Sequence, residues 1–416
     1  MTRTTKKITG LTLLTLLSLQ INILAQEISR SEYFAIMPFW ESPIVPFRGA
    51  YQITEAQAKQ RINLKLDYDN QNRIVQASVR LGDNLKSFEG FFGNLYINAP
   101  QTKVIYNEQG SRHHFYDILG NQIAVQNKIY EKRYQTDKYG RNVRLTYFDK
   151  DGNQTEDQFG NRSFDWHYNA DGSVTELRLD KDGAVVPLRG DFEFLRTRIT
   201  FGSDGHVNQL QNIDDSGQLV NAQCGAATLK YFYDNFGRFL RWEVYDKEGQ
   251  VARGPSSTAG EYNTFEGYEL QDIVFFDEHN NPATHWSGAE KWRFTTDKFG
   301  NKTSLKYLDA SNKPINGIRG YAGTTYAWDA SGRFLKTQTY INTAGQPMNH
   351  PELGYAIVEY IHNAKGLVTE IKYKDEKGEP VANRKNKVSI TRYSYSDKGV
   401  LTNTTYLDDK GNTISI

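Results

Sequence analysis

Hydrophobic and polar residues alternate along most of this chain, in short segments separated by turns that contain glycine. In one such segment Val143, Leu145 and Tyr147 alternate with Arg144 and Thr146. A period of two places successive side chains on opposite faces of a β-strand, so one face packs and the other contacts water. The pattern therefore predicts an all-β protein built from short antiparallel strands.

The turns between these segments recur at a fixed spacing. The most regular turn reads aromatic–Asp/Asn–x–x–Gly, as in Tyr233 to Gly237 and Trp328 to Gly332. Successive glycines of this turn are 30 to 34 residues apart, and a second turn follows each after 11 to 13 residues. Nine copies predict tandem β-hairpin repeats, with a period of about 33 residues, that form an elongated or spiral sheet. The nine glycines are Gly140, Gly172, Gly205, Gly237, Gly267, Gly300, Gly332, Gly366 and Gly399.

The residue types of this turn have a conformational reason. An Asp or Asn side chain at the first turn position can accept a hydrogen bond from the backbone N–H two residues on. Glycine at the last position adopts a positive φ without a steric penalty. Together they predict a type I turn followed by a G1 bulge, a common hairpin connection.

The alternation also assigns each side chain to a face of the sheet. We number residues by their offset from the first-turn glycine of the repeat. Side chains at offsets +3, +5 and +7 are expected to pack, and those at +4 and +6 to face solvent. In the Gly172 copy this places Leu177 and Leu179 inside, and Glu176 and Arg178 outside. An aromatic residue at offset −6 is expected to form a ladder along the array. This aromatic set is Tyr134, Trp166, Tyr231, Phe294, Tyr326, Tyr360 and Tyr393.

Prolines follow the second turn of several repeats, and because proline cannot donate to a ladder they mark strand ends. They are Pro282, Pro314, Pro347 and Pro380. The loops after them vary in length, and loops at one place in each repeat are expected to emerge on one side of the array.

The N-terminal part departs from the repeat. Basic residues precede an apolar run from Ile8 to Leu24, which predicts a cleaved signal peptide over residues 1–25. Residues 26–65 are predicted to form a cap, with a capping box at Thr54 and Gln57 that starts a helix from Glu55 to Ile62. The apolar segment from Tyr33 to Phe47 is expected to cover the first sheet edge. Degenerate hairpin repeats then occupy 66–129, and the regular array 130–416.

Two of the turns resemble a known repeat. The segments Tyr233 to Phe239 and Trp328 to Phe334 resemble the YD repeats of Rhs-type proteins, which read Tyr-Asp-x-x-Gly-Arg-Leu before a Thr-rich strand. Both segments have Phe in place of the final Leu. The likeness covers most of the array and concerns the fold. It implies a long antiparallel sheet that winds into a spiral or shell.

Composition narrows the classes of partner. Lys plus Arg is 50 and Asp plus Glu is 49, so the net charge of +1 gives no general attraction to nucleic acid or anionic membranes. No second long apolar run follows the signal peptide, so no membrane span is expected after cleavage. The single cysteine, Cys224, excludes an internal disulfide and is expected to be buried.

No sequence motif for catalysis, a cofactor or a metal is evident. The eight histidines have no metal-binding spacing, and we expect Asp149 and Asp151 to serve their turn and not a calcium ion. His362 occupies a position that is aromatic in other repeats, which favours a packing role. The sequence therefore predicts no catalytic, cofactor-binding or metal site.

Three hypotheses for function follow. The first is an exported, non-catalytic binding or scaffold protein, periplasmic or extracellular, whose partner is a glycan or an envelope protein; Trp286 is the candidate ligand-binding residue. The second is an enzyme acting on an envelope polymer, with its site near Trp40, His113 and His114 in the degenerate N-terminal part. The third is a structural envelope component that assembles with copies of itself.

Overall fold

The computed structural model describes residues 27–37, 41–87, 98–126, 128–189 and 192–416. The predicted signal peptide and Trp40 lie outside the described residues. In the described ranges, no helix has the length and apolar character that crossing a membrane requires.

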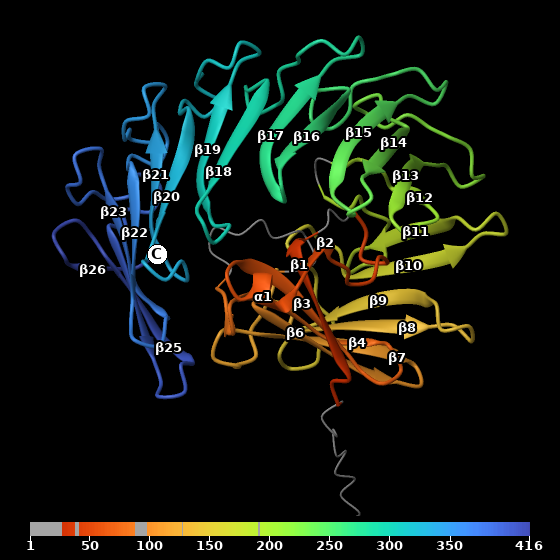
Figure 1. Cartoon of the computed structure of the whole chain (residues 1–416), viewed down its shortest axis with the longest axis horizontal. Helices are drawn as coiled ribbons and strands as arrows, with labels where there is room; N and C mark the ends of the chain where they lie inside the picture. Colours follow the sequence, from red (N-terminus) through yellow and green to blue (C-terminus); the bar gives the residue numbers. More distant parts are fainter. Residues whose placement is uncertain (1–26, 38–40, 88–97, 127, 190–191) are drawn as a thin grey trace, which may run out of the picture.

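The strands form one antiparallel sheet, and the prediction of tandem hairpins is confirmed (Figure 1). Pairing runs β2–β1–β3–β4–β6 and then in chain order to β26, while β5 pairs with the end of β4. The elements are β1 (Arg30–Ile36), β2 (Ala50–Ile53), α1 (Glu55–Ala58), β3 (Ile62–Tyr68), β4 (Ile74–Leu81), β5 (Asn84–Leu85), β6 (Gln101–Asn107), β7 (Gly110–Tyr116), β8 (Glu131–Thr136), β9 (Asn142–Phe148), β10 (Ser163–Tyr168), β11 (Val174–Leu179), β12 (Arg196–Phe201), β13 (Val207–Asn212), β14 (Thr228–Tyr233), β15 (Phe239–Tyr245), β16 (Gly260–Glu266), β17 (Glu269–Phe276), β18 (Lys291–Thr296), β19 (Lys302–Leu308), β20 (Gly323–Trp328), β21 (Leu335–Ile341), β22 (Ile357–His362), β23 (Val368–Lys374), β24 (Ile390–Tyr395), β25 (Leu401–Leu407) and β26 (Thr413–Ile414).

The first turn has the predicted chemistry in five of the described copies, at Asp137, Asp234, Asp297, Asp329 and Asn363. In the copy between β8 and β9, Asp137 Oδ1 accepts from the backbone N–H of Tyr139 at 2.9 Å and of Arg141 at 3.0 Å. Gly140 has a φ of +77°. The register of the two strands then shifts by one residue between Gln135 and Thr136, which is the expected bulge. The same carboxylate contacts explain Asp149 in the second turn, where Oδ1 accepts from the N–H groups of residues 151 and 153.

The bulge decides which side chains face inward. In most bulged copies it falls at offset +3, as at Val143, so offsets +5 and +7 pack while +3 is the unpaired residue. In the β16–β17 and β20–β21 hairpins the unpaired residue is at offset +4, at Gln271 and Lys336. The β10–β11 hairpin has no such shift, and Trp166 pairs with Glu176 where Tyr134 pairs with Leu145. A one-residue change of register exchanges the two faces of a strand. The sequence-based assignment was therefore wrong here: Glu176 and Arg178 are buried, and Leu177 and Leu179 are half-buried.

After the second turn, each repeat makes one isolated bridge and a further turn. Pro282, Pro314, Pro347 and Pro380 are the bridge residues in four repeats, which confirms that they mark strand ends. The loops that follow lie along the outer rim of the arc in Figure 1.

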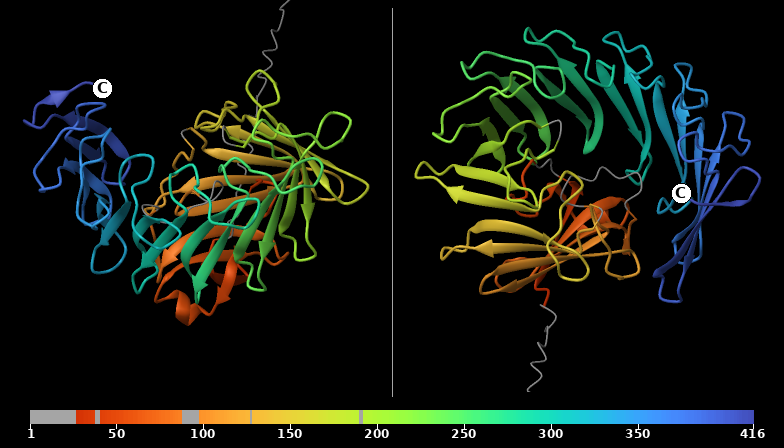
Figure 2. Two further views of the ribbon diagram at one scale, coloured as in Figure 1. Left: turned by 90° about the horizontal axis from the view of Figure 1, so that it is seen from above. Right: turned by 180° about the vertical axis from the view of Figure 1, so that it is seen from behind.

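The sheet curls into an open arc around the N-terminal strands (Figures 1 and 2). Successive first turns of the later repeats reach back to successive parts of the N-terminal region. Tyr51 N–H donates to Phe236 O at 2.7 Å, and Ile62 N–H donates to Phe299 O at 2.8 Å. We call this line of contacts the seam. Its other members are Arg48 with Asp204 O, Lys86 with Arg333 O, and Asn121 with Lys398 O.

The N-terminal cap differs partly from its prediction. The capping box is present, with Gln57 N–H donating to Thr54 Oγ1 at 3.3 Å. However, α1 ends at Ala58, because Ile62 already belongs to β3. The edge of β3 is covered by β1 and, beyond it, β2.

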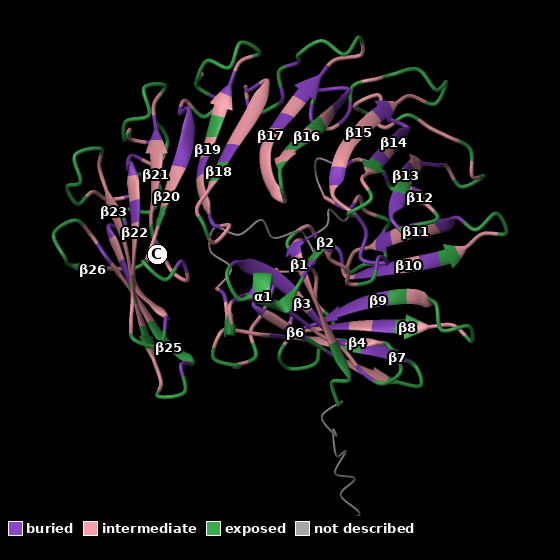
Figure 3. Ribbon diagram, viewed as in Figure 1, coloured by how far each residue is buried: buried purple, intermediate pink, exposed green. Residues whose placement is uncertain are grey.

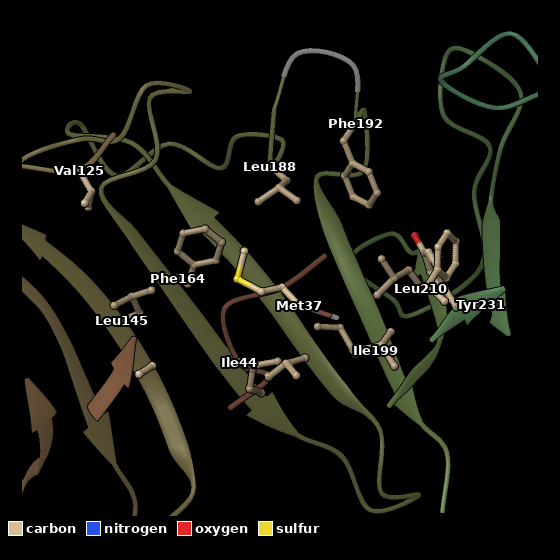
Figure 4. Packing of buried hydrophobic residues seen from close by; sticks show 14 of the residues in the cluster. Met37, Ile44, Val125, Leu145, Phe164, Leu188, Phe192, Ile199, Leu210 and Tyr231 are labelled. Atoms are coloured by element: carbon tan, nitrogen blue, oxygen red, sulfur yellow. The ribbon is translucent and has the colours of Figure 1, made fainter. Parts of the chain in front are cut away.

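The first part of the apolar segment, Tyr33 to Ile36, lies in β1 and covers the edge of β3 as expected. The part from Met37 on instead crosses the inner face of the arc. We call its described residues, Met37 and 41–48, the strap. Met37 and Ile44 lie among inward-facing side chains such as Leu145, Phe164 and Ile199 (Figure 4). The strap thus packs against the inner face of β9 to β12.

This arrangement makes the two halves of the molecule unequal. The main hydrophobic cluster draws on the strap and on strands up to β15, ending at Val244. In the second half, from β16 onward, the described residues form one small cluster of Ile273, Phe275 and Phe294. Figure 3 accordingly shows β22 to β25 as mostly intermediate in burial. Cys224, expected to be buried, is half-buried against the main cluster.

Candidate binding surface

The strap is held on the inner face by polar contacts as well as by packing. Tyr134 donates its hydroxyl to the carbonyl of Pro43 at 3.2 Å. Phe47 stacks on His113 with ring centroids 5.3 Å apart. Glu41 forms an ion pair with Arg189 at 3.0 Å. These contacts show that the inner face of this sheet holds a segment from outside the repeat, which turns at Pro43 and Ile44.

The buried pair Glu176–Arg178 anchors the middle of the strap. The two side chains are each 1% exposed and 2.7 Å apart. Glu176 also accepts from Trp166 Nε1 at 2.8 Å and from the Ser42 hydroxyl. Arg178 donates to Thr197 Oγ1 at 2.9 Å and to the carbonyl of Leu195 at 3.1 Å. These hydrogen bonds replace the contacts with water that the two charged groups lose, so the pair can be buried.

A second acidic group faces the strap at its end. Glu261 lies on β16, opposite Trp242 and Phe275 on the neighbouring strands. Burial raises the pKa of Glu261 to about 7, and the nearby Glu41 carboxylate adds to the rise, while a hydrogen bond from Trp242 opposes it. A carboxyl group with this pKa is partly protonated near neutral pH.

Among the described residues, the strap does not extend over the inner face of the second half. The register places Tyr360 opposite Ile371, as Tyr134 is opposite Leu145, so Tyr360 occupies the offset of a strap-binding tyrosine. On β22 to β25 its neighbours on the same face are aromatic, hydroxyl-bearing or aliphatic. On β20 and β21 the face also includes the amide of Gln338, and Lys302 Nζ lies 5.9 Å from the Tyr326 ring centroid. We call this half-buried surface on β20 to β25 the tyrosine face. Its tyrosines are Tyr326, Tyr340, Tyr360, Tyr373, Tyr393, Tyr395 and Tyr406.

The aromatic ladder predicted at offset −6 is present between Tyr134 and Trp166, whose rings stack with centroids 6.2 Å apart. A longer run of ring contacts forms in the second half and includes residues from the rim loops. It starts at Phe275 and ends at Tyr373, where the Tyr355–Tyr373 centroids are 4.5 Å apart. The intermediate rings are Trp292, Tyr307, Tyr321, Tyr340 and Tyr355.

The candidate residue Trp286 lies on the rim loop between β17 and β18. Its side chain is 50% exposed and its ring centroid is 4.9 Å from that of His285. Ile318, on the next rim loop, is also exposed and donates its N–H to Ser287 O at 2.7 Å. Trp286 is therefore accessible, but it is separate from the tyrosine face.

The two N-terminal histidines do not form a joint site. Adjacent residues of a strand point to opposite faces, so His113 and His114 diverge on β7. His113 faces the strap, whereas His114 lies 3.8 Å from Glu131 and contacts Gln122. The structure therefore does not bring the two imidazole rings together on one face of β7. His362 packs against Phe334 at 5.1 Å, as its position among the repeats predicted.

No protein-family model and no curated protein matches this chain. Among solved structures, the chain is similar to a TcdB2-TccC3 complex, with 12% identity over 86% of this chain and a TM-score of 0.21. A Photorhabdus luminescens Tc holotoxin pore gives 12% identity over 84% of this chain and a TM-score of 0.26. TcdB2-TccC3 without its hypervariable C-terminal region gives 13% over 92% and a TM-score of 0.22.

The chain spans 24%, 22% and 27% of the length of these three solved chains, respectively. Overlaps with such TM-scores support no statement about activity or partners. The resemblance to YD-repeat proteins is one of fold. It rests on the Asp-capped turns and the unbroken series of antiparallel hairpins described above.

Proposed function

We propose that this protein is an exported, non-catalytic repeat scaffold that binds an extended segment of a partner protein on its tyrosine face. The observation that carries the proposal is the strap. In the first half, the same inner face at the same offsets holds a proline-containing segment of the chain itself.

The chemistry of the tyrosine face indicates what the partner segment contains. Phenol rings offer flat apolar area, and their hydroxyl groups can donate to backbone carbonyls, as Tyr134 donates to Pro43. On β22 to β25 the side chains of this face carry no formal charge to match a charged ligand. Aromatic grooves suit proline-containing segments, because such segments are already extended and lose little entropy on binding. The expected ligand is therefore an apolar, proline-containing stretch like residues 37–48, which contain Pro38, Pro43 and Pro46.

A peptide with the sequence of residues 37–48 provides a direct probe. We expect saturable binding to the mature protein in isothermal titration calorimetry. The double change Tyr360→Ala with Tyr393→Ala should weaken binding about tenfold or more, because aromatic anchors usually contribute above ~1 kcal/mol each. Ile361→Ala is the matched control, since Ile361 neighbours Tyr360 but faces outward. Equal affinity in the double variant and the wild type would reject the tyrosine face.

Export rests on the basic residues and the apolar run at the N-terminus. Expression of the full chain in a bacterial host followed by mass spectrometry tests it. We expect the mature protein outside the cytoplasm with residues up to Ala25 removed, and an intact cytoplasmic chain would contradict this part.

A second candidate function is glycan binding at Trp286, favoured by its exposed indole on the rim. Sugar rings stack on such surfaces through their C–H faces, in the manner of other apolar contacts with aromatic rings. Because Trp286 lies away from the tyrosine face, the two candidates can be tested with separate variants.

A further inference from the structure

A pocket of about 640 Å³ lies between the strap and the inner face of the degenerate repeats. Pro43, Val45, Pro46 and Phe47 of the strap form one wall. The opposite wall is formed by side chains of β6, β7 and β8, and the first turns at Asn72 and Gly140 border it. The volume falls in the range of about 300–1,000 Å³ that is typical of small-molecule sites.

The two ends of the pocket differ in chemistry. Phe47, Tyr68 and Tyr106 supply half-buried aromatic surface, and Ile74 adds an aliphatic side chain. Lys132, which is only 2% exposed, lines the wall beside the rings of Phe115 and Tyr147. Arg73 also lines the pocket, with its guanidinium 4.5 Å from the Tyr106 ring centroid, but it is partly exposed and paired with Asp69. The pocket thus combines an apolar body with one buried cation, Lys132.

The polar groups around Lys132 are fixed in place. Its cross-strand neighbour is His113, whose ring lies between Phe47 and Tyr134, with centroids 5.3 Å and 4.7 Å away. Ser111 Oγ lies 3.3 Å from His113 Nε2. Burial, helped by the charge of Lys132, lowers the pKa of His113 to about 3, so the ring is neutral and adds no charge.

Burying the charged ammonium of Lys132 costs free energy, because the group loses its hydration. Burial lowers the pKa of Lys132 to about 8, although the nearby Asp157 carboxylate acts in the opposite direction. Desolvation therefore outweighs the attraction of Asp157. An anion that entered the pocket would add an attraction in a region of low dielectric constant, where such interactions are strong.

We propose that this pocket binds a small amphipathic anion, with its charged group toward Lys132 and its apolar body against Phe47 and Tyr106. A medium-chain carboxylate or an aromatic sulfonate has this chemistry. The site is independent of the tyrosine face, which lies on the other half of the array.

The test uses the mature protein with the fluorescent anion 8-anilinonaphthalene-1-sulfonate as reporter. The fall in its fluorescence measures displacement by decanoate or by the uncharged analogue decanol. We expect decanoate to displace the reporter at concentrations about tenfold lower than decanol, since one buried ion pair distinguishes them. Lys132→Met should remove this preference. Equal displacement by both compounds in the wild-type protein would overturn the proposal.

Lys302→Met is the matched control. Lys302 is also a buried lysine, and burial lowers its pKa to about 8 as well, but it does not line the pocket. We expect it to keep the preference for decanoate. Thr136→Trp, at the lining, should block both compounds while leaving Lys132 unchanged. If Thr136→Trp leaves displacement unaffected, the reporter binds elsewhere and the proposal fails, even if Lys132→Met does not fold.

Discussion

The two halves of the array are built from the same hairpin, yet their inner faces differ. Tyr134 and Tyr360 occupy the same offset and pair with the corresponding residue of the next strand. Tyr134 is 8% exposed beneath the strap, whereas Tyr360 is half-buried. The repeat sequence therefore sets which side chains face inward. In the first half, a segment from outside the repeat completes the burial of these side chains.

The largest expected effect concerns two charge pairs at identical offsets. Glu176–Arg178 is buried because its hairpin lacks the bulge, whereas Glu370–Lys372, at the same offsets from Gly366, lies on the outer face. Arg178→Met leaves a buried carboxylate without its cation and should cost about 3–5 kcal/mol. Lys372→Met should cost less than about 1 kcal/mol. Urea unfolding measures both, and similar losses would contradict the assignment of faces.

The next effect compares the equivalent tyrosines. Tyr134→Ala removes a buried ring and the hydrogen bond to Pro43, and should destabilise the first half by about 3–4 kcal/mol. Tyr360→Ala removes a half-buried ring and should cost roughly 1 kcal/mol. Protease susceptibility as a function of urea reports the change in each half. Equal losses would mean that the strap contributes little to the burial of Tyr134.

The third effect depends on pH and lies at the boundary between the halves. The folded-state pKa of Glu261 is raised from 4.5 to about 7, so its neutral form is favoured in the folded protein. Below pH 4.5 Glu261 is neutral in both the folded and the unfolded protein, so it does not lower the free energy of unfolding. As the pH rises through 7, the buried carboxyl group must ionise, and the free energy of unfolding falls. Glu261→Gln should therefore stabilise the protein at pH 8 by up to about 3 kcal/mol, and change little at pH 4.5. Thermal unfolding at the two pH values measures this. A stabilisation that is the same at both would exclude the carboxyl group as its cause.

The smallest effect on stability is expected at Trp286. Because its side chain is half exposed on the rim, Trp286→Ala should change the free energy of unfolding by less than about 0.5 kcal/mol. If the glycan hypothesis is correct, the same change abolishes glycan-array binding while binding of the strap peptide is retained. Retained glycan binding would remove Trp286 as the site.

The repeat, its turns and the all-β class were predictable from the sequence, because local residue chemistry determines them. Asp137 and Gly140 are sufficient to specify their turn. The faces of β11 were not predictable, because one missing bulge shifts Glu176 inward and the aliphatic neighbours Leu177 and Leu179 gave the opposite signal. Alternating apolar residues in a sequence do not show which register the strand adopts, and the register decides which face is buried.

The candidate surfaces were less predictable than the fold. The apolar stretch that became the strap was recognised as part of a cap, but its path depends on contacts with residues such as Arg189, far along the chain. His113 was identified as a residue of interest, whereas Lys132, which faces the same pocket, carried no sequence signal apart from an inward offset in its strand. Only the curled sheet and the strap bring these residues together.

The seam has a consequence for how the chain folds. In most repeat proteins each unit contacts its neighbours alone, so contacts are close in sequence and folding spreads from one unit to the next. Here Lys86 contacts Arg333, and Asn121 contacts Lys398, across 247 and 277 residues. Closing such long loops costs entropy that short hairpins avoid. We therefore expect the hairpins to form first and the seam last, so that the seam N–H groups of Tyr51 and Ile62 exchange with deuterium sooner than those within the paired strands.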